Sequence, residues 1–600
     1  MLKPFGQPGQ TTSNAMGNLC APELELDCQL ACAGHVHTCK YPMYLVKVSD
    51  FLLMSGTPQP NHVLAERGLL HKWQPGMFTI FVSHQWLGAG HPDETGRQLE
   101  VLREAVRRLI NGKLQVEVDV TSATPLSRLT PFNSNRKVSR RTRQQIASGF
   151  MFLDWWAIPQ ITARQHGVNE TETRSEAALA VQSIPAYVEA ADLFLALVPE
   201  LVHASTGLPC DYASWLSRGW CRAELWCRLL SNKRETSVVV IHSSQEAEIM
   251  FPLDWQRNLI ADGCFTVEGD RSTVVKLGEV AMASKLQCLR EKGPLSHYRF
   301  HMAQQPKLLG REREHFNEEA FLQFFNFSSI EDALTDQSGV NGLFCAVLSG
   351  NVAMIRLLAE NKADVNRGLP DLSELGFYET QTMLMAAAKS HQDPSVLSAL
   401  IECKAEVSAR SRSGVTASFL ARSAGQVHAL VNARADLAEM NALNGAAGRA
   451  NTETVKAILD LKIHPEFQRN GKYGTLHSIA LWGRGNPDAI SNARLLLSHR
   501  ADANRVARPN YEILLDCAVC SASADIWGLE NSSSITRVWA SLPGLSVLGA
   551  AALTGSSSLV RLLVESKAQV SANDRGDLPH ELAAACGHTH LLPLLETWQV

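Results

Sequence analysis

The sequence predicts two fold classes in one chain, an α/β domain built on an open parallel sheet and an all-α array of repeated helix pairs. Before about residue 336, short apolar runs typical of buried strands alternate with helix-like segments, which is the pattern of an α/β domain. After it, apolar helix endings are followed repeatedly by similar turn motifs, such as KADVN at 362–366. A recurrence of this kind indicates stacked helical units.

We predict four segments along the 600 residues, which are too many for one hydrophobic core. Residues 1–40 form a loose segment that contains several cysteines and histidines, and residues 41–245 form the α/β domain. Residues 246–335 form a helical connector, and its apolar end at 317–334 is expected to cap the array. Residues 336–600 form the helical repeats.

The composition is that of an ordinary globular protein, with 45% hydrophobic and 19% charged residues. A net charge of −4 gives no bias toward nucleic acid. The most apolar runs, such as VLGAAALTG at 547–555, are far shorter than the roughly 18 to 20 residues that span a membrane. Fourteen cysteines are too few for a disulfide scaffold of this length. We therefore expect a cytoplasmic protein with reduced thiols, no nucleic-acid partner and no membrane span.

Each expected strand of the α/β domain is a short apolar run with a polar end. The first, MFTIFVSHQW at 77–86, is followed by an amphipathic helix at 96–112. The remaining strands are expected at 149–160, 193–200 and 236–242, with further helices at 175–192 and 217–231. Ligands of open parallel sheets bind beyond the carboxyl ends of the strands, so we expect a site where these runs end.

Four motifs in this order resemble those of a Toll/interleukin-receptor (TIR) domain: FTIFVSHQ, FMFLDWWAIP, ADLFLALVP and WCRAEL, the last at 220–225. The resemblance implies a TIR-like open parallel sheet with flanking helices. In NAD+-cleaving members of that family the glutamate of a W-x-x-x-E pattern is catalytic, and it corresponds here to Glu224. The expected NAD+ cleft is then lined by Ser83, His84, Trp156 and Trp220.

One carboxylate suffices for this reaction. Nicotinamide leaves as a neutral pyridine from a cationic ring and needs no general acid, so one of the two carboxyl groups of ordinary glycosidases is unnecessary. The remaining task is to stabilise an oxocarbenium-like ribose, which one preorganised carboxylate can do electrostatically. In this interpretation Glu224 is the predicted catalytic residue and NAD+ is the substrate. No other cofactor is indicated.

The alternative is a structural role for Glu224. It precedes Arg228 by four residues, which is the favourable order for an exposed ion pair on a helix. Many TIR domains with this tryptophan and glutamate are adaptors that cleave nothing. Two departures from the family pattern favour this alternative, the long connection at 111–148 and the bulky Trp155 and Trp156 after the second strand. The domain would then mediate assembly, including association with other TIR domains.

The second half resembles an array of ankyrin repeats. Its turn motifs begin at residues 362, 404, 434, 500 and 567, and the last two intervals, 66 and 67 residues, are close to twice the 33 residues of an ankyrin unit. Segments 341–366, 474–504 and 577–596 retain further parts of that pattern. The resemblance implies an ankyrin-repeat solenoid of six to seven units, in which 505–541 is either an insertion or an eroded repeat.

An ankyrin solenoid buries each unit against its neighbour and leaves a long concave surface. We expect this surface to bind protein partners, and the alternative is a spacer that holds the first half. The leading interpretation is therefore an intracellular signalling or interaction protein. The alternative is an NAD+ hydrolase that uses Glu224 and is regulated by the ankyrin half.

A weaker signal lies near the N-terminus, where four thiols and two imidazoles fall within 20 residues. Such a group could bind zinc tetrahedrally, but its spacing lacks the C-x2-C knuckle, and ordinary reduced cysteines are the alternative. The residues concerned are Cys20, Cys28, Cys32, His35, His37 and Cys39.

Overall fold

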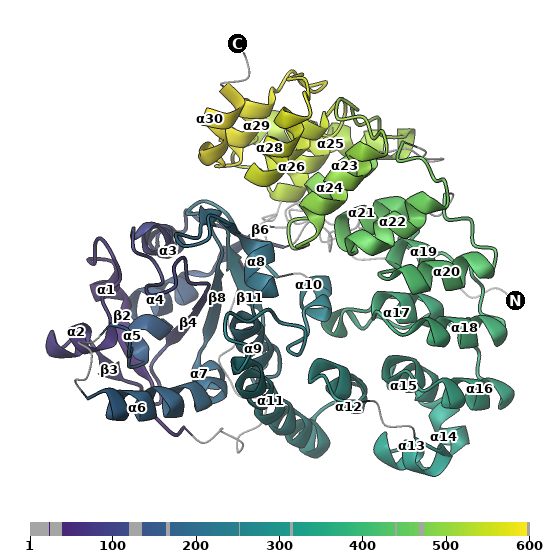
Figure 1. Cartoon of the computed structure of the whole chain (residues 1–600), viewed down its shortest axis with the longest axis horizontal. Coiled ribbons are helices and arrows are strands. Elements are labelled where there is room, and N and C mark those ends of the chain that lie inside the picture. Colours follow the sequence, from purple (N-terminus) through teal and green to yellow (C-terminus); the bar gives the residue numbers. More distant parts are fainter. Residues whose placement is uncertain are drawn as a thin grey trace, which may run out of the picture.

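The computed structural model describes residues 23–24, 39–118, 135–163, 169–250, 252–312, 316–438, 441–466 and 473–596. A mixed sheet with its helices forms one part of the molecule, and an arc of paired helices forms the other (Figure 1). In the first pairs of the arc, the first helix of each pair lies on the side of the sheet-containing part (Figure 1).

Four parallel strands form the centre of the sheet, in the order β11 (Val238–Ile241), β8 (Leu193–Leu197), β4 (Thr79–His84) and β7 (Phe150–Phe152). Every residue of β4, β8 and β11 is buried, which explains their continuous apolar sequences. The first three expected strands are therefore parallel neighbours in one sheet. Across β7, β4 and β8, the ring of Phe81 stacks on those of Phe152 and Phe194, at centroid distances of 4.6 and 5.3 Å.

The sheet is larger than predicted and is not wholly parallel. On one side it continues through β2 (Tyr44–Lys47) and β3 (His71–Lys72), both antiparallel to their neighbours. On the other side it continues through β12 (Ala247–Ile249), β5 (Val116–Val118), β6 (Asn135–Val138) and β1 (Glu23–Leu24). Strands of two to four residues are too short to show a period in the sequence. The expected boundary at residue 245 therefore falls just before β12.

The helix α11 (Asp270–Lys292) also belongs to the α/β part rather than to a connector. Its residues Val274, Leu277 and Met282 lie in the same buried core as the strands. It packs on α9 (Gly219–Leu229) and α7 (Ile184–Ala190). The next helix, α12 (Leu295–Leu308), contributes Leu308 to this core and Phe300 to the core of the array, so it joins the two parts.

Helices α13 (Glu318–Phe324) and α14 (Ile330–Thr335) lie at the start of the array, within the range expected to cap it. Phe321 and Phe325 are fully buried in the core that the first helix pair shares. The apolar side chains of this range thus cover the outer face of the terminal unit, which would otherwise be exposed to water.

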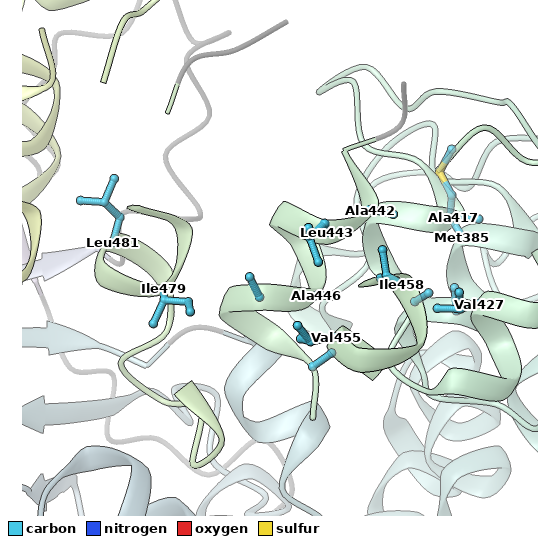
Figure 2. Close-up of a cluster of buried hydrophobic side chains, with 14 of the residues drawn as sticks. Met385, Ala417, Val427, Ala442, Leu443, Ala446, Val455, Ile458, Ile479 and Leu481 are labelled. Atoms are coloured by element: carbon cyan, nitrogen blue, oxygen red, sulfur yellow. The ribbon is translucent and has the colours of Figure 1, made fainter. Parts of the chain in front are cut away.

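Within the described residues, the array consists of successive helix pairs that share one continuous core. Small side chains allow neighbouring helices to pack closely. Figure 2 shows this for Ala442 and Ala446, which lie beside Val455 and Ile458. The pairs are α15/α16 (Gly342–Ser349, Val352–Glu360), α17/α18 (Met383–Lys389, Pro394–Glu402), α19/α20 (Ala417–Leu420, Ala424–Asn432), α21/α22 (Ala442–Arg449, Thr452–Asp460), α23/α24 (Thr475–Trp482, Ala489–Ser498), α27/α28 (Val547–Thr554, Ser557–Glu565) and α29/α30 (Pro579–Ala585, Leu592–Glu596).

Each predicted turn motif begins with a basic residue in the left-handed backbone region. Such a conformation costs a residue other than glycine roughly 1–2 kcal/mol, so its recurrence shows that the turn is imposed by the stacking of the units. A sixth turn of the same kind, at Lys462, lies in a segment whose sequence, LKIHPE, has lost the motif. The six residues are Lys362, Lys404, Arg434, Lys462, Arg500 and Lys567.

The segment near 505–541 is an insertion and not an eroded repeat. It forms a hairpin of α25 (Tyr511–Trp527) and α26 (Ser534–Ser541). Meanwhile α23 packs directly on α27, and α24 on α28. The two ends of the insertion meet, since the amide of Ala507 donates to the carbonyl of Leu545 at 2.8 Å and the amide of Gly544 donates to Ala507 at 3.0 Å. Gly544 has a φ of +71°, which a glycine adopts without strain.

A partly buried ion pair joins the α/β part to the array. The carboxylate of Glu246, next to β12, accepts two hydrogen bonds from the guanidinium of Arg484, at 2.6 and 3.0 Å. His588 lies 3.9 Å from the same carboxylate. Burial alone would raise the pKa of Glu246, but Arg484 and His588 hold that pKa well below its usual range. The carboxylate is therefore ionised and bound in a two-point contact.

Two further glutamates of the α/β part reach the first residues of array helices. Glu117 accepts from the amide of Ser534 at 2.8 Å and pairs with Arg537 at 3.0 Å, so the insertion docks on β5. Glu200, which follows β8, accepts from the amide of Ser557 at 3.2 Å. Helix N-termini attract carboxylates because their amides lack partners within the helix.

The array therefore faces the α/β part of its own chain. Besides the three glutamates, α10 (Pro252–Arg257) contacts it, since the side-chain amide of Gln256 donates to the carbonyl of Leu375 at 2.7 Å. At Gly485, an added side chain would touch Leu216 and Asp254. The inner surface that the sequence assigns to protein partners is thus occupied in part by the chain itself.

We predict that Glu246→Gln destabilises the protein by about 2 kcal/mol, because it leaves the partly buried guanidinium of Arg484 without its carboxylate. Urea unfolding followed by tryptophan fluorescence measures this change. As the control, Glu565→Gln breaks the pair of Glu565 with Arg494, whose side chains are 63% and 62% exposed, and should change stability by less than about 1 kcal/mol. Equal effects of the two variants would contradict a structural role for the partly buried pair.

Candidate active site

Four polar side chains meet where β4 and β7 end. Ser83 and His84 are the last residues of β4, and Asp154 begins α5 (Asp154–Ala157), two residues beyond the end of β7. Glu224 reaches them from α9. The hydroxyl of Ser83 donates to the carboxyl of Glu224 at 2.5 Å, and Nε2 of His84 lies 2.8 Å from Asp154. Because β4 lies between β7 and β8, this is the point where the strand order changes direction, at which open sheets bind ligands.

The imidazole of His84 is held at both nitrogens. Nδ1 lies 2.7 Å from the side-chain oxygen of Gln98, and the indole of Trp86 donates to the second oxygen of Asp154 at 2.9 Å. Burial would lower the pKa of His84, but the charge and hydrogen bond of Asp154 outweigh it, so this pKa is raised. Burial would raise the pKa of Asp154, but the charge and hydrogen bond of His84 outweigh it, so this pKa is lowered. The two groups form a charged pair.

The carboxyl of Glu224 is the most perturbed acid of the cluster. Burial raises its pKa to about 8, while the hydrogen bond from Ser83 lowers it and the charge of Asp154 raises it further. The residue nevertheless retains partial solvent access. At neutral pH, Glu224 is therefore mostly protonated, and it ionises as the pH passes 8 or as a cation comes near. Such a group is suited to face a positively charged substrate.

The sequence interpretation missed one residue of this cluster, Trp215. It lies on α8 (Tyr212–Ser217), and its indole donates to the hydroxyl of Ser83 at 3.2 Å. Ser83 therefore accepts from Trp215 while it donates to Glu224, which fixes the direction of its hydroxyl. The available signal was the tryptophan five residues before Trp220, but only Trp220 belongs to the W-x-x-x-E pattern.

Two residues expected to line the NAD+ cleft have other contacts. Trp156 is fully buried, and its indole points to the carbonyl of Met151 at 3.4 Å. The indole of Trp220 donates to Asp270 of α11 at 3.1 Å. Helical spacing places Trp220 one turn from Glu224, but α11 packs on α9 and the ring of Trp220 contacts it there. Ser83 and His84 do lie beside Glu224 and Asp154.

The exposed ion pair considered for Glu224 is also not what the structure shows. Arg228 is fully buried, and its guanidinium donates to main-chain carbonyls of Ala191, Asp192, Glu235 and Ser237, at 2.9–3.4 Å. It thus ties α9 to the segments that immediately precede β8 and β11. The favourable i, i+4 order gave no information here, since the arginine points into the core.

The candidate zinc ligands lie almost entirely outside the described residues, and only Cys39 can be placed. Its thiol is exposed and donates to the carbonyl of Tyr41 at 2.8 Å. Among the described residues, no group of three or more histidine, cysteine or acidic side chains is arranged to hold a metal ion. Cys288 on α11 is disulfide-bonded, so the expectation of reduced thiols does not extend to every cysteine.

No family model matches this chain, and no curated protein is similar to it. Among solved structures it is similar to the ankyrin repeat domain of Bcl-3, described as a unique member of the IkappaB protein family. The identity is 22% and the TM-score 0.26, with 41% of this chain and 96% of that domain covered. A likeness at this level assigns no function. In the described part of the chain, no helix combines the length and the apolarity needed to cross a bilayer.

We predict that Glu224→Gln changes how stability depends on pH. The folded protein binds the Glu224 proton more tightly than the unfolded chain, so wild type loses stability as the pH rises from about 4.5 to about 8. The variant carries no such proton and should gain relative to wild type over this range. The gain should be a few kcal/mol at most, because each tenfold change in proton affinity is worth about 1.4 kcal/mol and partial solvent access reduces it.

The measurement is urea unfolding of both proteins at several pH values, with the exposed Glu172→Gln as the control. The control should follow the wild-type curve throughout. A Glu224→Gln curve parallel to wild type would show that this carboxyl titrates as it does in the unfolded chain.

Proposed function

We propose that this protein is an interaction protein in which an ankyrin-repeat array holds and controls a TIR-like α/β domain. The observation that carries the proposal is the docking of the array on the α/β domain through Glu117, Glu200 and Glu246. These residues come from three different segments of the α/β part, and each meets a different part of the array. A spacer would not need such specific contacts.

The finer assignments are part of this proposal. The order of β11, β8, β4 and β7, with the first expected strand between the second and third, supports a TIR-like domain. The helix pairs and their recurrent left-handed turns support ankyrin repeats. A cytoplasmic location and self-association of the α/β domain remain predictions.

Helix α8 supports a controlling role for the array. On one side, the indole of Trp215 contacts Ser83 in the candidate site. On the other, Tyr212 donates to Asp254 of α10 at 3.0 Å, and Gly485 of the array packs closely against Tyr212 and Leu216. A change in the position of the array would therefore shift the residue that orients Ser83 and, through it, Glu224.

For binding to other proteins, the insertion supports the proposal better than the occupied inner surface. Helix α25 exposes a set of large apolar side chains, which is unusual outside interaction sites. Those that are most exposed are Tyr511, Leu515, Val519, Ile526 and Trp527.

Exchanging the charges of Glu246 and Arg484, which join the α/β part to the array, tests the proposal. Arg484→Glu places two carboxylates in contact and should release the array, which hydrogen exchange would report as faster exchange in α8, α10 and α23. Combining it with Glu246→Arg restores opposite charges, and most of the protection should return. If the double variant exchanges as fast as the single one, the contact does not hold the array in place.

A second candidate function is hydrolysis of the nicotinamide–ribose bond of NAD+ by the α/β domain. It is favoured by the contact of Ser83 with Glu224 at the carboxyl edge of the sheet. We propose that an ionised Glu224 would stabilise the ribose cation, while Ser83 and Trp215 would hold its carboxyl in place. Because the pKa of Glu224 is about 8, kcat/KM should rise with pH up to that value.

We expect the full chain to release nicotinamide from NAD+ and Glu224→Gln to lower turnover about 100- to 1000-fold. The control, Glu172→Gln, lies on the exposed surface and should retain full activity. Absence of nicotinamide at high protein concentration, or equal rates for Glu224→Gln and wild type, would exclude this second function and leave the first intact.

A further inference from the structure

A row of basic side chains follows the inner helices of the array. Lys389 ends α17, Arg422 lies two residues beyond α19, and Arg449 ends α21. Arg484 continues the row, two residues beyond α23. Cations are favoured at helix C-termini, but this effect does not replace a counter-charge. Glu246 is the counter-charge of Arg484. Among the described residues, Lys389 and Arg422 have no such ion pair.

Lys389 and Arg422 are buried, and no carboxylate of the described residues forms an ion pair with either side chain. Only 3% of Lys389 is exposed; its ammonium donates to the carbonyl of Gly376 and lies over the rings of Phe377 and Tyr378, at 5.2 and 4.7 Å. Arg422 is 7% exposed. Among the residues that the structure places, its guanidinium has no hydrogen bond or ion pair. Buried guanidinium groups normally bind acceptors through their fixed fork of donors.

The α/β part contributes a further cation, Arg257, to this region. From α10, Arg257 donates to the carbonyl of Arg449, while its Nε is buried and has no partner in the described structure. The nearby carboxylate is Asp254, which already accepts from Tyr212 at 3.0 Å. Arg257, Arg422 and Arg449 all lie within electrostatic reach of Asp254. Asp254 thus faces several basic groups at once.

The proton affinities of these groups reflect the excess of positive charge. Burial, together with Arg422 and Arg449, lowers the pKa of Lys389 to about 7. Burial and the neighbouring arginines Arg257 and Arg449 likewise lower the pKa of Arg422 well below its usual range. His391, beside Lys307 and Arg422, is a further basic group whose pKa is lowered, mainly by burial.

We infer that Lys389, Arg422 and Arg257 form a binding site for a small phosphorylated anion between the inner face of the array and α10. Buried cations without partners are strongly unfavourable, and an anion that accepts their free donors removes this penalty. Phosphate suits the site because guanidinium groups bind its oxygens in pairs and an ammonium adds a point charge. The ligand would contact both parts of the chain and strengthen their docking.

Thermal unfolding of the full chain with inorganic phosphate and with pyrophosphate tests this inference, with sodium chloride at matched ionic strength as the reference. We expect a saturating rise in Tm of a few degrees with the phosphates only. Titration calorimetry with pyrophosphate should show an affinity that falls at least about tenfold in Arg422→Gln.

Two further variants separate binding from folding. Lys389→Met keeps the contact with the rings of Phe377 and Tyr378 but removes the charge, so it should bind pyrophosphate more weakly while its Tm without anion is equal to or above that of wild type. The matched control is Arg412→Gln, since Arg412 is exposed on the same array and pairs with Glu379; its response to pyrophosphate should be that of wild type.

A rise in Tm that follows ionic strength alone would overturn the inference. It would also be overturned by an unchanged pyrophosphate response in Lys389→Met, or by a clear loss of Tm in that variant without anion, since this loss would show that Lys389 already has an internal counter-charge. None of these results would alter the charge-exchange test of the docking itself.

Discussion

The position of the array on the sheet depends on the ion pair between Glu246 and Arg484. Partial burial strengthens this interaction, because the two side chains are largely shielded from water where the two parts meet. Glu246 immediately precedes β12, which lies between β5 and β11 and is antiparallel to the central four strands, and Arg484 lies in the turn after α23. Because Ala247 pairs with the last residue of β11, the ion pair connects the carboxyl edge of the sheet to the middle of the array. The contacts of Glu117 and Glu200 fix the orientation around it.

The candidate site is built from segments with different degrees of constraint. Ser83 and His84 end a strand that is buried along its whole length, so their positions follow from the sheet. Glu224 is held by α9, which Arg228 ties to the core through main-chain carbonyls. Trp215 lies on a short helix between the site and the array. This difference explains how docking of the array could act on the site without moving the strands.

The insertion between α24 and α27 shows how an array can gain a new contact. Its two ends are joined by the main-chain bonds of Ala507 with Gly544 and Leu545, so the stacking of the flanking units is unaffected by its length. A long surface excursion of this kind adds little to the entropy of loop closure. Arg537, which pairs with Glu117 of the sheet, lies on the inserted α26. The insertion therefore contributes to the docking of the two parts as well as exposing apolar residues.

The sequence by itself determined the elements whose evidence is local. Continuous apolar runs predicted the central strands and brought Ser83, His84 and Glu224 to one edge of the sheet, and recurring turn motifs predicted the paired helices. Only the tertiary structure decided the short edge strands, the burial of Arg228 and Trp156, the role of Trp215 and the status of 505–541. These features depend on contacts between residues tens to hundreds of positions apart, which no local period records. The docking of the array is the clearest case, since an isolated glutamate such as Glu246 has no sequence pattern and gains its meaning only from the arginine that it meets.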